Sequence, residues 1–415
     1  MTEPRTRPHT QAIIVGAGPG GSSTAWHLAQ LGVEVLLLDR AAFPRNKVCA
    51  EYLSPQASRI LSSMGAMEAV EASKPAHLTG MRVRAPNGFE IHGSFVAEHG
   101  YRAFRDRGLA LQRSLLDAIL VQRARVAGVT VMERAHVTDV VRDGDGAVNG
   151  VCITDSDGAK REVRAPLVIG ADGLRSVVGR RLGLTRVSRF PRRVAFVAHY
   201  RNVPGVSEVG EMHVERDGYV GIADVGHGLT NVALVVPSKL ARGAAGDAGG
   251  MLDGWLARHP QLAWRFARAE RVEPVRVTGP FASSSRRAWA PGAALVGDAA
   301  DFFDPFTGEG VYSALRGGEM LAPFAAEAVL RGGKRAVVAL EEYERTRRTE
   351  FHGKWLVEKI IAGTVAVPAL INHAARALSR RREMADLLVG VAGDFVPPSK
   401  VLSVGYITRL LVFGV

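Results

Sequence analysis

A glycine-rich hexapeptide placed directly after a short apolar run constrains the fold of this chain more than any other feature. Residues 12–15 (Ala-Ile-Ile-Val) are typical of a buried parallel strand, and the hexapeptide follows at residues 16–21. A helix is predicted over about 20–31, and a second buried strand over 33–38. Because parallel neighbouring strands need a crossover connection, this segment predicts a βαβ unit.

The hexapeptide, Gly-Ala-Gly-Pro-Gly-Gly, has a glycine at each position where a dinucleotide-binding loop needs one. Gly16 permits the tight turn, Gly18 lets a pyrophosphate approach the backbone, and Gly21 lets helix and strand pack closely. The helix N-terminus offers amide hydrogens and a partial positive charge to phosphates. Asp39 lies 18 residues after Gly21, near the ~20 expected for a carboxylate that binds a ribose. The unit therefore predicts dinucleotide binding without distinguishing NAD from FAD.

Two later stretches are predicted to form further sheets. The first is a meander within about 129–168, with short runs at 130–133, 137–141 and 150–154. The second is a separate sheet within about 190–276, with strands at 194–200, 211–214, 219–225 and 230–236 and a helix at 251–268. From about residue 310 onward the pattern is mostly helical.

Composition narrows the class of protein. Only two cysteines occur among 415 residues, which excludes a disulfide framework, and no metal site is expected. The net charge is +12, but the arginines are scattered without interleaved aromatic residues, so no nucleic acid partner is expected. The first ten residues hold no apolar signal region, and the apolar stretch at 360–371 is too short for a bilayer span of ~20 residues. We expect a cytoplasmic protein whose membrane contact is at most peripheral, through the apolar tail at 396–415.

Two motifs after the βαβ unit carry a family resemblance. Ile169-Gly-Ala-Asp172-Gly173-Leu-Arg-Ser176 resembles the DG motif of flavoprotein hydroxylases, and Leu295-Val-Gly297-Asp298-Ala-Ala resembles their GD motif, whose aspartate contacts the ribityl chain of FAD. With the hexapeptide, this ordered triplet resembles the para-hydroxybenzoate hydroxylase-like superfamily of FAD-dependent oxidoreductases over about 10–335. That group includes aromatic monooxygenases, flavin halogenases and geranylgeranyl reductases.

The resemblance implies an α/β fold. It consists of a Rossmann-like FAD-binding domain of GR2 type, an inserted mixed β-sheet substrate domain and C-terminal helices. The FAD-binding domain is expected to be discontinuous, over 9–77, 104–185 and 277–335. The substrate domain is assigned to 78–103 and 186–276, and the helical region to 336–415.

The same resemblance implies further FAD-binding residues. Arg113 occupies the position of an FAD-contacting arginine, and Arg40 and Lys47 are assigned to the cofactor as well. In the segment at 304–310, Pro305, Gly308 and Gly310 precede a helix predicted over 311–330. Small residues there would let the flavin ring approach the backbone. A helix N-terminus facing the ring would favour its negative charge on reduction by up to ~2 kcal/mol.

The branch of the superfamily is indicated by the segment at 47–55, Lys-Val-Cys-Ala-Glu-Tyr-Leu-Ser-Pro, which resembles geranylgeranyl reductase-like proteins. Thr-Gly-Glu-Gly at 307–310 points the same way. The tryptophan motif of halogenases is absent, and of the aromatic element of lipid reductases only Tyr219 is kept. Cys49 is either a proton donor beside the flavin or a small buried apolar residue. His199, His213 and His227 are candidate bases, and none is assigned.

Three functions follow from the resemblance. The leading one is a monooxygenase that uses NAD(P)H and dioxygen. Its substrate would be a small organic molecule with a bulky apolar skeleton, of aromatic or polyketide type, which it hydroxylates or epoxidises. The alternative is reduction of a carbon–carbon double bond, with Cys49 protonating the product. A non-catalytic binding protein on the same fold is the third. Because no second dinucleotide fingerprint occurs, NAD(P)H is expected to dock transiently, unless a redox partner protein supplies the electrons.

Overall fold

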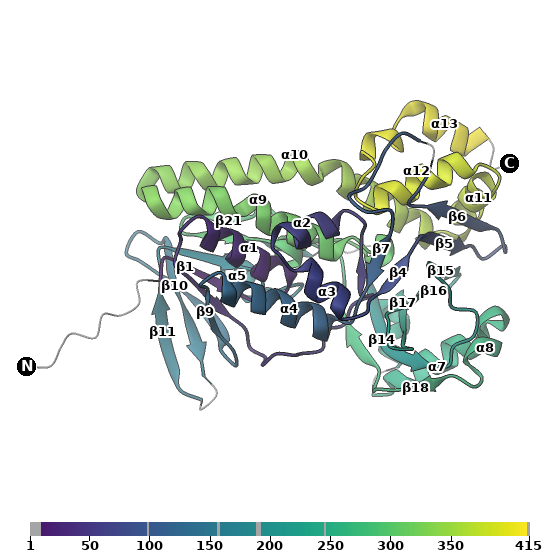
Figure 1. Cartoon of the computed structure of the whole chain (residues 1–415), viewed down its shortest axis with the longest axis horizontal. Helices are drawn as coiled ribbons and strands as arrows, with labels where there is room; N and C mark the ends of the chain where they lie inside the picture. The colour runs from purple at the N-terminus through teal and green to yellow at the C-terminus, as the bar shows by residue number, and fades with distance from the viewer. Residues whose placement is uncertain (1–9, 98, 156–157, 188–191, 245, 413–415) are drawn as a thin grey trace, which may run out of the picture.

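The computed structural model describes residues 10–412 except 98, 156–157, 188–191 and 245. A parallel sheet with its helices forms one end of the elongated molecule, and a second sheet forms the other (Figure 1). The long helix α10 (Gly333–Ala366) runs above the end with the parallel sheet and leads to the C-terminal helices at the other end (Figure 1). The two sheets and this helix position the candidate site.

The βαβ unit is present as predicted. β1 (Ala12–Val15) pairs in parallel with β2 (Val35–Leu38), and α1 (Pro19–Gln30) connects them. All residues of both strands are buried, because α1 covers one face of the sheet and the meander packs on the other. On its own face of the sheet, α1 contacts α9 (Gly310–Arg331) and α4 (Arg113–Val126). The sheet order is β21-β22-β12-β1-β2-β8, with β21 at Trp289–Ala290, β22 at Ala293–Leu295, β12 at Leu167–Gly170 and β8 at Thr130–Met132.

The placement of residues 130–133 in the meander is wrong. β8 pairs in parallel with β2 and forms the edge of the first sheet, reached through α4. A three-residue apolar run carries too little periodicity to identify its neighbour, which the crossover helix decides. The meander itself has three antiparallel strands, β9 (His136–Arg142), β10 (Val148–Thr154) and β11 (Lys160–Arg164).

The second sheet has the order β18-β14-β17-β16-β15-β5-β6, with β19 also paired to β14. Its predicted central strands are confirmed as β14 (Arg193–Arg201), β15 (Val209–Glu215), β16 (Gly218–Asp224) and β17 (Thr230–Pro237). β5 joins β15 in parallel. The outer strands are β5 (Gly80–Arg84), β6 (Glu90–Ser94), β18 (Glu270–Arg271) and β19 (Arg276–Thr278).

The single helix predicted over 251–268 is two helices, α7 (Ala248–Arg258) and α8 (Pro260–Phe266). His259 between them has an extended backbone, and Pro260 begins the second helix because proline cannot continue the hydrogen bonding of the first. The remaining helices are α2 (Ala57–Ser63), α3 (Met67–Ala72), α5 (Val177–Arg181) and α6 (Ser238–Gly243). Two small sheets contain β3 (Tyr52–Leu53), β7 (Gly108–Ala110) and β4 (Ala76–Leu78), and β13 (Thr185–Val187), β20 (Ser283–Ser285) and β23 (Asp301–Phe302).

The C-terminal region folds onto the second sheet. After α10 come α11 (Pro368–Ser379), α12 (Arg382–Ala392) and α13 (Val404–Val412), and both α11 and α12 pack against β6. Val396, Val401 and Tyr406 share one apolar core with residues of β15 and β16. The described part of the tail therefore packs on the core of that sheet through these residues, while Val404, Leu411 and Val412 are exposed.

Across the described residues, no individual helix is both long enough and apolar enough to cross a bilayer. One sharply bent pair, α10 with α11, meets the requirement by length and composition only.

Candidate functional site

The loop between β1 and α1 forms a cradle that tolerates almost no added side chain. Gly16 has φ of +100°, and a Cβ there would lie 2.5 Å from the Ala171 carbonyl oxygen. A Cβ on Gly21 would lie 1.8 Å from the Gly16 carbonyl oxygen. At Gly18, the N-cap of α1, the nearest atoms to a Cβ are the guanidinium nitrogens of Arg113 and Arg45, each at 3.7 Å. Two cations and a helix N-terminus therefore face the open space above Gly18, which suits a pyrophosphate.

Asp39 fixes this loop. Its Oδ2 accepts a hydrogen bond from the Ala17 amide at 2.9 Å, and its Oδ1 accepts one from the Ala41 amide at 2.9 Å. Arg45 approaches the same carboxylate at 3.4 Å. Because Oδ2 also accepts from Arg45, it is Oδ1 that keeps a second lone pair for a ribose hydroxyl. The side chain of Arg40, in contrast, is exposed on the surface.

Arg113 is buried at the start of α4 and forms a two-point ion pair with Asp117, at 2.8 and 2.9 Å. Arg45 lies 3.2 Å from Oδ2 of Asp117, which Arg113 also contacts. The sequence reasoning missed both Arg45 and Asp117. The spacing could have predicted Asp117, since an acidic residue four positions after an arginine in a helix lies on the same face as that arginine. For Arg45, the only signal in the sequence was its position two residues before Lys47.

The DG and GD motifs converge on the cradle from two other strands. Asp172 follows β12 and accepts a hydrogen bond from the Val177 amide at the start of α5. Its second oxygen is buried and has no hydrogen-bond partner among the residues that the structure describes. Asp298 follows β22, and burial raises its pKa, opposed by the positive charges of Lys47 and Arg113. An unsatisfied buried acceptor and a carboxylate beside two cations both suit the hydroxyl groups of a bound nucleotide.

The segment at 304–310 forms a short 3₁₀ turn (Pro305–Thr307) before α9. Gly308 has φ of +73°, and a Cβ there would lie 2.8 Å from the ring of Tyr52. Asp304 accepts hydrogen bonds from the Tyr219 hydroxyl at 2.6 Å and from Arg193, both on the second sheet. Asp304 therefore ties the Pro305 turn to the second sheet, and Gly310 begins α9 beside it.

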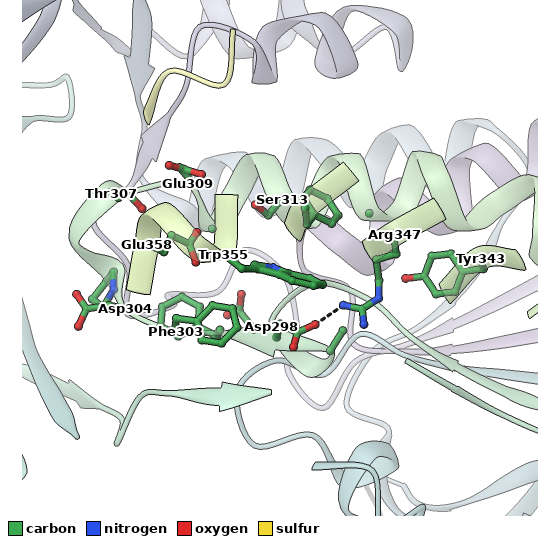
Figure 2. Close-up of a pocket in the computed structure, with 18 residues that line it drawn as sticks. Asp298, Phe303, Asp304, Thr307, Glu309, Ser313, Tyr343, Arg347, Trp355 and Glu358 are labelled. Atoms are coloured by element: carbon green, nitrogen blue, oxygen red, sulfur yellow. Dashed lines mark hydrogen bonds and ion pairs between the residues drawn. The ribbon is translucent and has the colours of Figure 1, made fainter. Parts of the chain in front are cut away.

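A small cavity of about 60 Å³ lies next to this turn (Figure 2). Asp298, Pro305 and Ser313 line one side, and Trp355 and Glu358 of α10 line the other. Burial and the neighbouring charge of Glu309 raise the pKa of Glu358 well above its usual range. None of the residues that line the cavity belongs to the glycine hexapeptide, so the cavity is distinct from the space above Gly18.

Cys49 lies beside Arg113 at the inner edge of the site. Its Sγ accepts a hydrogen bond from the Glu51 amide at 3.3 Å. Burial raises the pKa of the Cys49 thiol, while the charge of Arg113 opposes that shift. The surroundings of this half-buried thiol therefore favour its protonated form.

The three candidate histidines differ in position. The ring of His199 contacts the carboxylate of Glu51 at 2.6 Å, two residues from Cys49. His213 is bonded to Glu211 at 2.8 Å, and His227 is exposed with its ring near the Ser73 carbonyl. Of the three, His199 alone is joined to the Cys49 segment within the described chain.

The arrangement fits FAD. It provides a glycine cradle at a helix start, cations above it, and carboxylates that remain able to accept hydrogen bonds from hydroxyl groups. The structure brings together all the predicted cofactor residues except Arg40. That each of them contacts FAD remains a prediction.

Comparisons with known proteins agree with this geometry. A family model described as FAD binding domain matches residues 9–215. Digeranylgeranylglycerophospholipid reductase 2 of Methanopyrus kandleri is 33% identical over 92% of this chain and 93% of its own.

Two solved structures have the same fold. The myxobacterial chondrochloren halogenase, described as a new variant of FAD-dependent halogenases, has a TM-score of 0.78 with 26% identity over 86% of this chain and 83% of its own. A geranylgeranyl bacteriochlorophyll reductase-like protein from Thermoplasma acidophilum has a TM-score of 0.74 with 23% identity over 97% and 95% of the two chains. The latter shows the fold alone.

Proposed function

This chain belongs to the FAD-dependent oxidoreductases of the para-hydroxybenzoate hydroxylase-like superfamily, in the geranylgeranyl reductase-like branch, and we propose that it reduces carbon–carbon double bonds of a polyprenyl-type substrate. The observation that carries the proposal is the position of the Cys49 thiol, which lies beside Arg113 in the predicted flavin site and accepts a hydrogen bond from the Glu51 amide. Addition of hydrogen across a double bond needs a hydride for one carbon and a proton for the other. A hydroxylase needs no such thiol.

The residues present divide the work of binding. The amides at the start of α1, with Arg45 and Arg113, would neutralise the pyrophosphate. Asp39 and Asp298 would accept hydrogen bonds from the sugar hydroxyls. FAD, when bound and reduced, supplies the hydride equivalent.

Cys49 would hold the proton that the second carbon receives. Its raised pKa keeps the thiol protonated until the product carbon needs a proton. The thiolate left behind regains a proton from solvent, so two electrons and two hydrogens are added to each double bond. NAD(P)H or a redox partner protein is proposed as the source of the electrons.

This proposal departs from the hydroxylation that the sequence favoured. Support for reduction comes from the named reductase that is similar to this chain along nearly all of its length. Retention of Tyr219 alone from the aromatic element of lipid reductases argued against a polyprenyl substrate. In the structure, however, the Tyr219 hydroxyl is bonded to Asp304 and its ring packs on Phe306, so this tyrosine supports the Pro305 turn and its isolation carries little weight against such a substrate.

The test is a reaction without oxygen. FAD-loaded protein, reduced with dithionite, is mixed with a phospholipid bearing geranylgeranyl chains, and the mass of the product is measured by mass spectrometry. We expect a gain of two hydrogens for each double bond reduced. Cys49→Ala should lower the single-turnover rate by about a hundredfold, the range typical of a general acid. Cys152→Ala, at a half-buried position of the meander, should leave the rate unchanged. A product formed only in air and carrying an atom of labelled dioxygen would instead establish the monooxygenase.

A further inference from the structure

The backbone at Glu51 is held in a left-handed conformation, with φ of +62°, immediately after the Cys49 segment. A non-glycine residue adopts this conformation at a cost and keeps it only where neighbours fix it. Two bonds come from the FAD-binding part of the chain. The Glu51 carbonyl accepts from the Leu111 amide at 3.0 Å, and its Oε1 accepts from the Arg113 amide at 2.9 Å.

The substrate sheet supplies the remaining partners of this turn. His199 on β14 and Asn231 on β17 are directly opposite each other in register, so their side chains emerge on the same face. The amide nitrogen of Asn231 lies 3.0 Å from Glu51 Oε2 and 3.1 Å from the Cys49 carbonyl oxygen. His199 Nε2 lies 2.6 Å from the same Oε2. One side-chain pair thus joins the second sheet to the Cys49–Glu51 turn.

His199 also has a carboxylate on its other side. Its Nδ1 lies 2.6 Å from Glu273 Oε1, and the other oxygen of Glu273 is 3.3 Å from Arg276. Both ring nitrogens can donate only in the imidazolium form. Burial lowers the pKa of His199, but the hydrogen bonds and charges of Glu51 and Glu273 outweigh burial and raise it overall. The two carboxylates therefore favour the charged form of the bridge.

We propose that His199 is a positioning residue, whose protonated ring bridges Glu51 and Glu273 and so holds the Cys49–Glu51 turn against the flavin site. Loss of the proton releases the turn. The purpose of holding Cys49 rests on the proposed function, but the bridge itself does not.

The direction of the pH effect follows from the charges around the ring. Glu51 faces His199 from the turn, Glu273 and Arg276 face it from the connection between β18 and β19, and β17 contributes the neutral Asn231. With its proton, the ring donates to both carboxylates. Without it, one ring nitrogen presents a lone pair to a carboxylate, and that contact becomes repulsive. The turn is held at a pH below the raised pKa of His199 and is released above it.

The reactivity of the Cys49 thiol reports on the turn and needs no substrate. In FAD-loaded protein carrying Cys152→Ser, the rate of alkylation by iodoacetamide is measured across pH. His199→Gln keeps one donor but cannot carry the charge. We expect Cys49 in this variant to react about tenfold faster than in the parent at pH ~6, because the charge-assisted hydrogen bonds of His199 are lost. The ratio should fall toward one at high pH, where the parent has released its own turn.

His213→Gln is the matched control, since His213 is a buried histidine on the same sheet, bonded to the single carboxylate of Glu211. It should follow the parent at every pH. Equal acceleration in both variants, or none in His199→Gln, overturns the proposal. These outcomes leave the product assay untouched, so failure of the bridge and failure of the reductase function are distinguishable.

A second variant covers the case in which His199→Gln does not fold with FAD. Glu273→Gln removes the outer carboxylate, which is one-fifth exposed, and should lower the pKa of His199. The pH at which Cys49 becomes reactive, and the titration of the labelled His199 ring in NMR spectra, should shift down together. An unchanged pair of titrations overturns the proposal.

Discussion

Among single residues, Gly18 and Gly21 have different roles, the first in FAD binding and the second in protein stability. A Cβ on Gly21 collides with backbone, whereas a Cβ on Gly18 makes ordinary contacts with two arginines. We predict that Gly21→Ala destabilises the apoprotein by about 3 kcal/mol, the upper range for overpacking. Gly18→Ala should leave apoprotein stability nearly unchanged but weaken FAD binding by about tenfold or more, because the methyl group occupies the space of the pyrophosphate. Urea unfolding and flavin fluorescence titration measure the two effects.

Gly254 offers a control for both variants. It lies inside α7, and nothing lies within 4 Å of where its Cβ would be. Gly254→Ala should therefore raise stability by up to about 1 kcal/mol through helix propensity. Should Gly18→Ala destabilise the apoprotein as much as Gly21→Ala does, the assignment of Gly18 to the cofactor is wrong.

At the scale of elements, a buried ion pair joins α10 to the site. Arg347 contacts Asp301 on β23 and lies 3.1 Å from Glu344 of its own helix. Burial raises the pKa of Asp301, and the charge of Arg347 opposes that shift. Arg347→Met should cost about 3 kcal/mol, because Asp301 is left buried without a cation. Urea unfolding measures the loss.

The control for that prediction lies on the same helix. Arg345 pairs with Glu342 at 2.9 Å, with both side chains largely exposed, and Arg345→Met should cost less than about 1 kcal/mol. Adding Asp301→Asn to Arg347→Met should restore part of the stability. If the double variant is no more stable than Arg347→Met, the unpaired charge is not the cause.

The second sheet contains a carboxylate that should govern its behaviour in acid. Glu211 on β15 is bonded to His213 and to Arg265 at 2.7 and 3.1 Å. Burial acts to raise the pKa of Glu211, but these partners outweigh it and lower the pKa to about 2. The stabilisation is complete above the ordinary value near 4.5 and is lost as pH falls toward 2.

Glu211→Gln should therefore remove about 3 kcal/mol of stability at neutral pH, from roughly 2.5 pKa units at 1.36 kcal/mol each. The difference from wild type should shrink on acidification from pH ~4.5 to ~2. Urea unfolding at a series of pH values measures it. Glu162→Gln, at an exposed pair with Arg164, should show no such slope. A constant difference between wild type and Glu211→Gln would contradict the linkage.

For the whole molecule, the predicted FAD site draws on segments that are far apart in sequence. Its predicted residues lie on or directly after different strands of the first sheet and the helices that cover it. They are the cradle at 16–21, Arg113, Asp172 and Asp298. Removal of FAD should lower the free energy of unfolding by about 2.7 kcal/mol relative to FAD at a hundred times its dissociation constant. Calorimetry of wild type should show a melting temperature that rises with FAD concentration. In Asp298→Ala the rise should be smaller, and a melting temperature independent of FAD in wild type would refute the site.

The two ends of the molecule meet at a few polar contacts. Asp304 is tied to Tyr219 and Arg193, and Glu51 is tied to His199 and Asn231. Both joints place the second sheet against segments that border the predicted flavin. The contact between the two ends therefore includes the Pro305 turn and the Cys49–Glu51 turn.

The sequence by itself determined the features that depend on short stretches of chain. The glycine cradle follows from local steric limits, and the strands at 12–15 and 219–225 follow from apolar patterns a few residues long. The ordered motifs also sufficed to predict an FAD-dependent oxidoreductase, which the family model and the similar reductase confirm.

The tertiary structure alone decided which distant residues meet. Residues 130–132 joined the parallel sheet, Arg45 came to face Gly18, and of three equivalent histidines only His199 reached the Cys49 segment. A local pattern states how buried a residue is and in which element it lies, but not its partner across the fold. Partner choice depends on how whole elements pack, since burial of their apolar faces outweighs the preferences of any short segment.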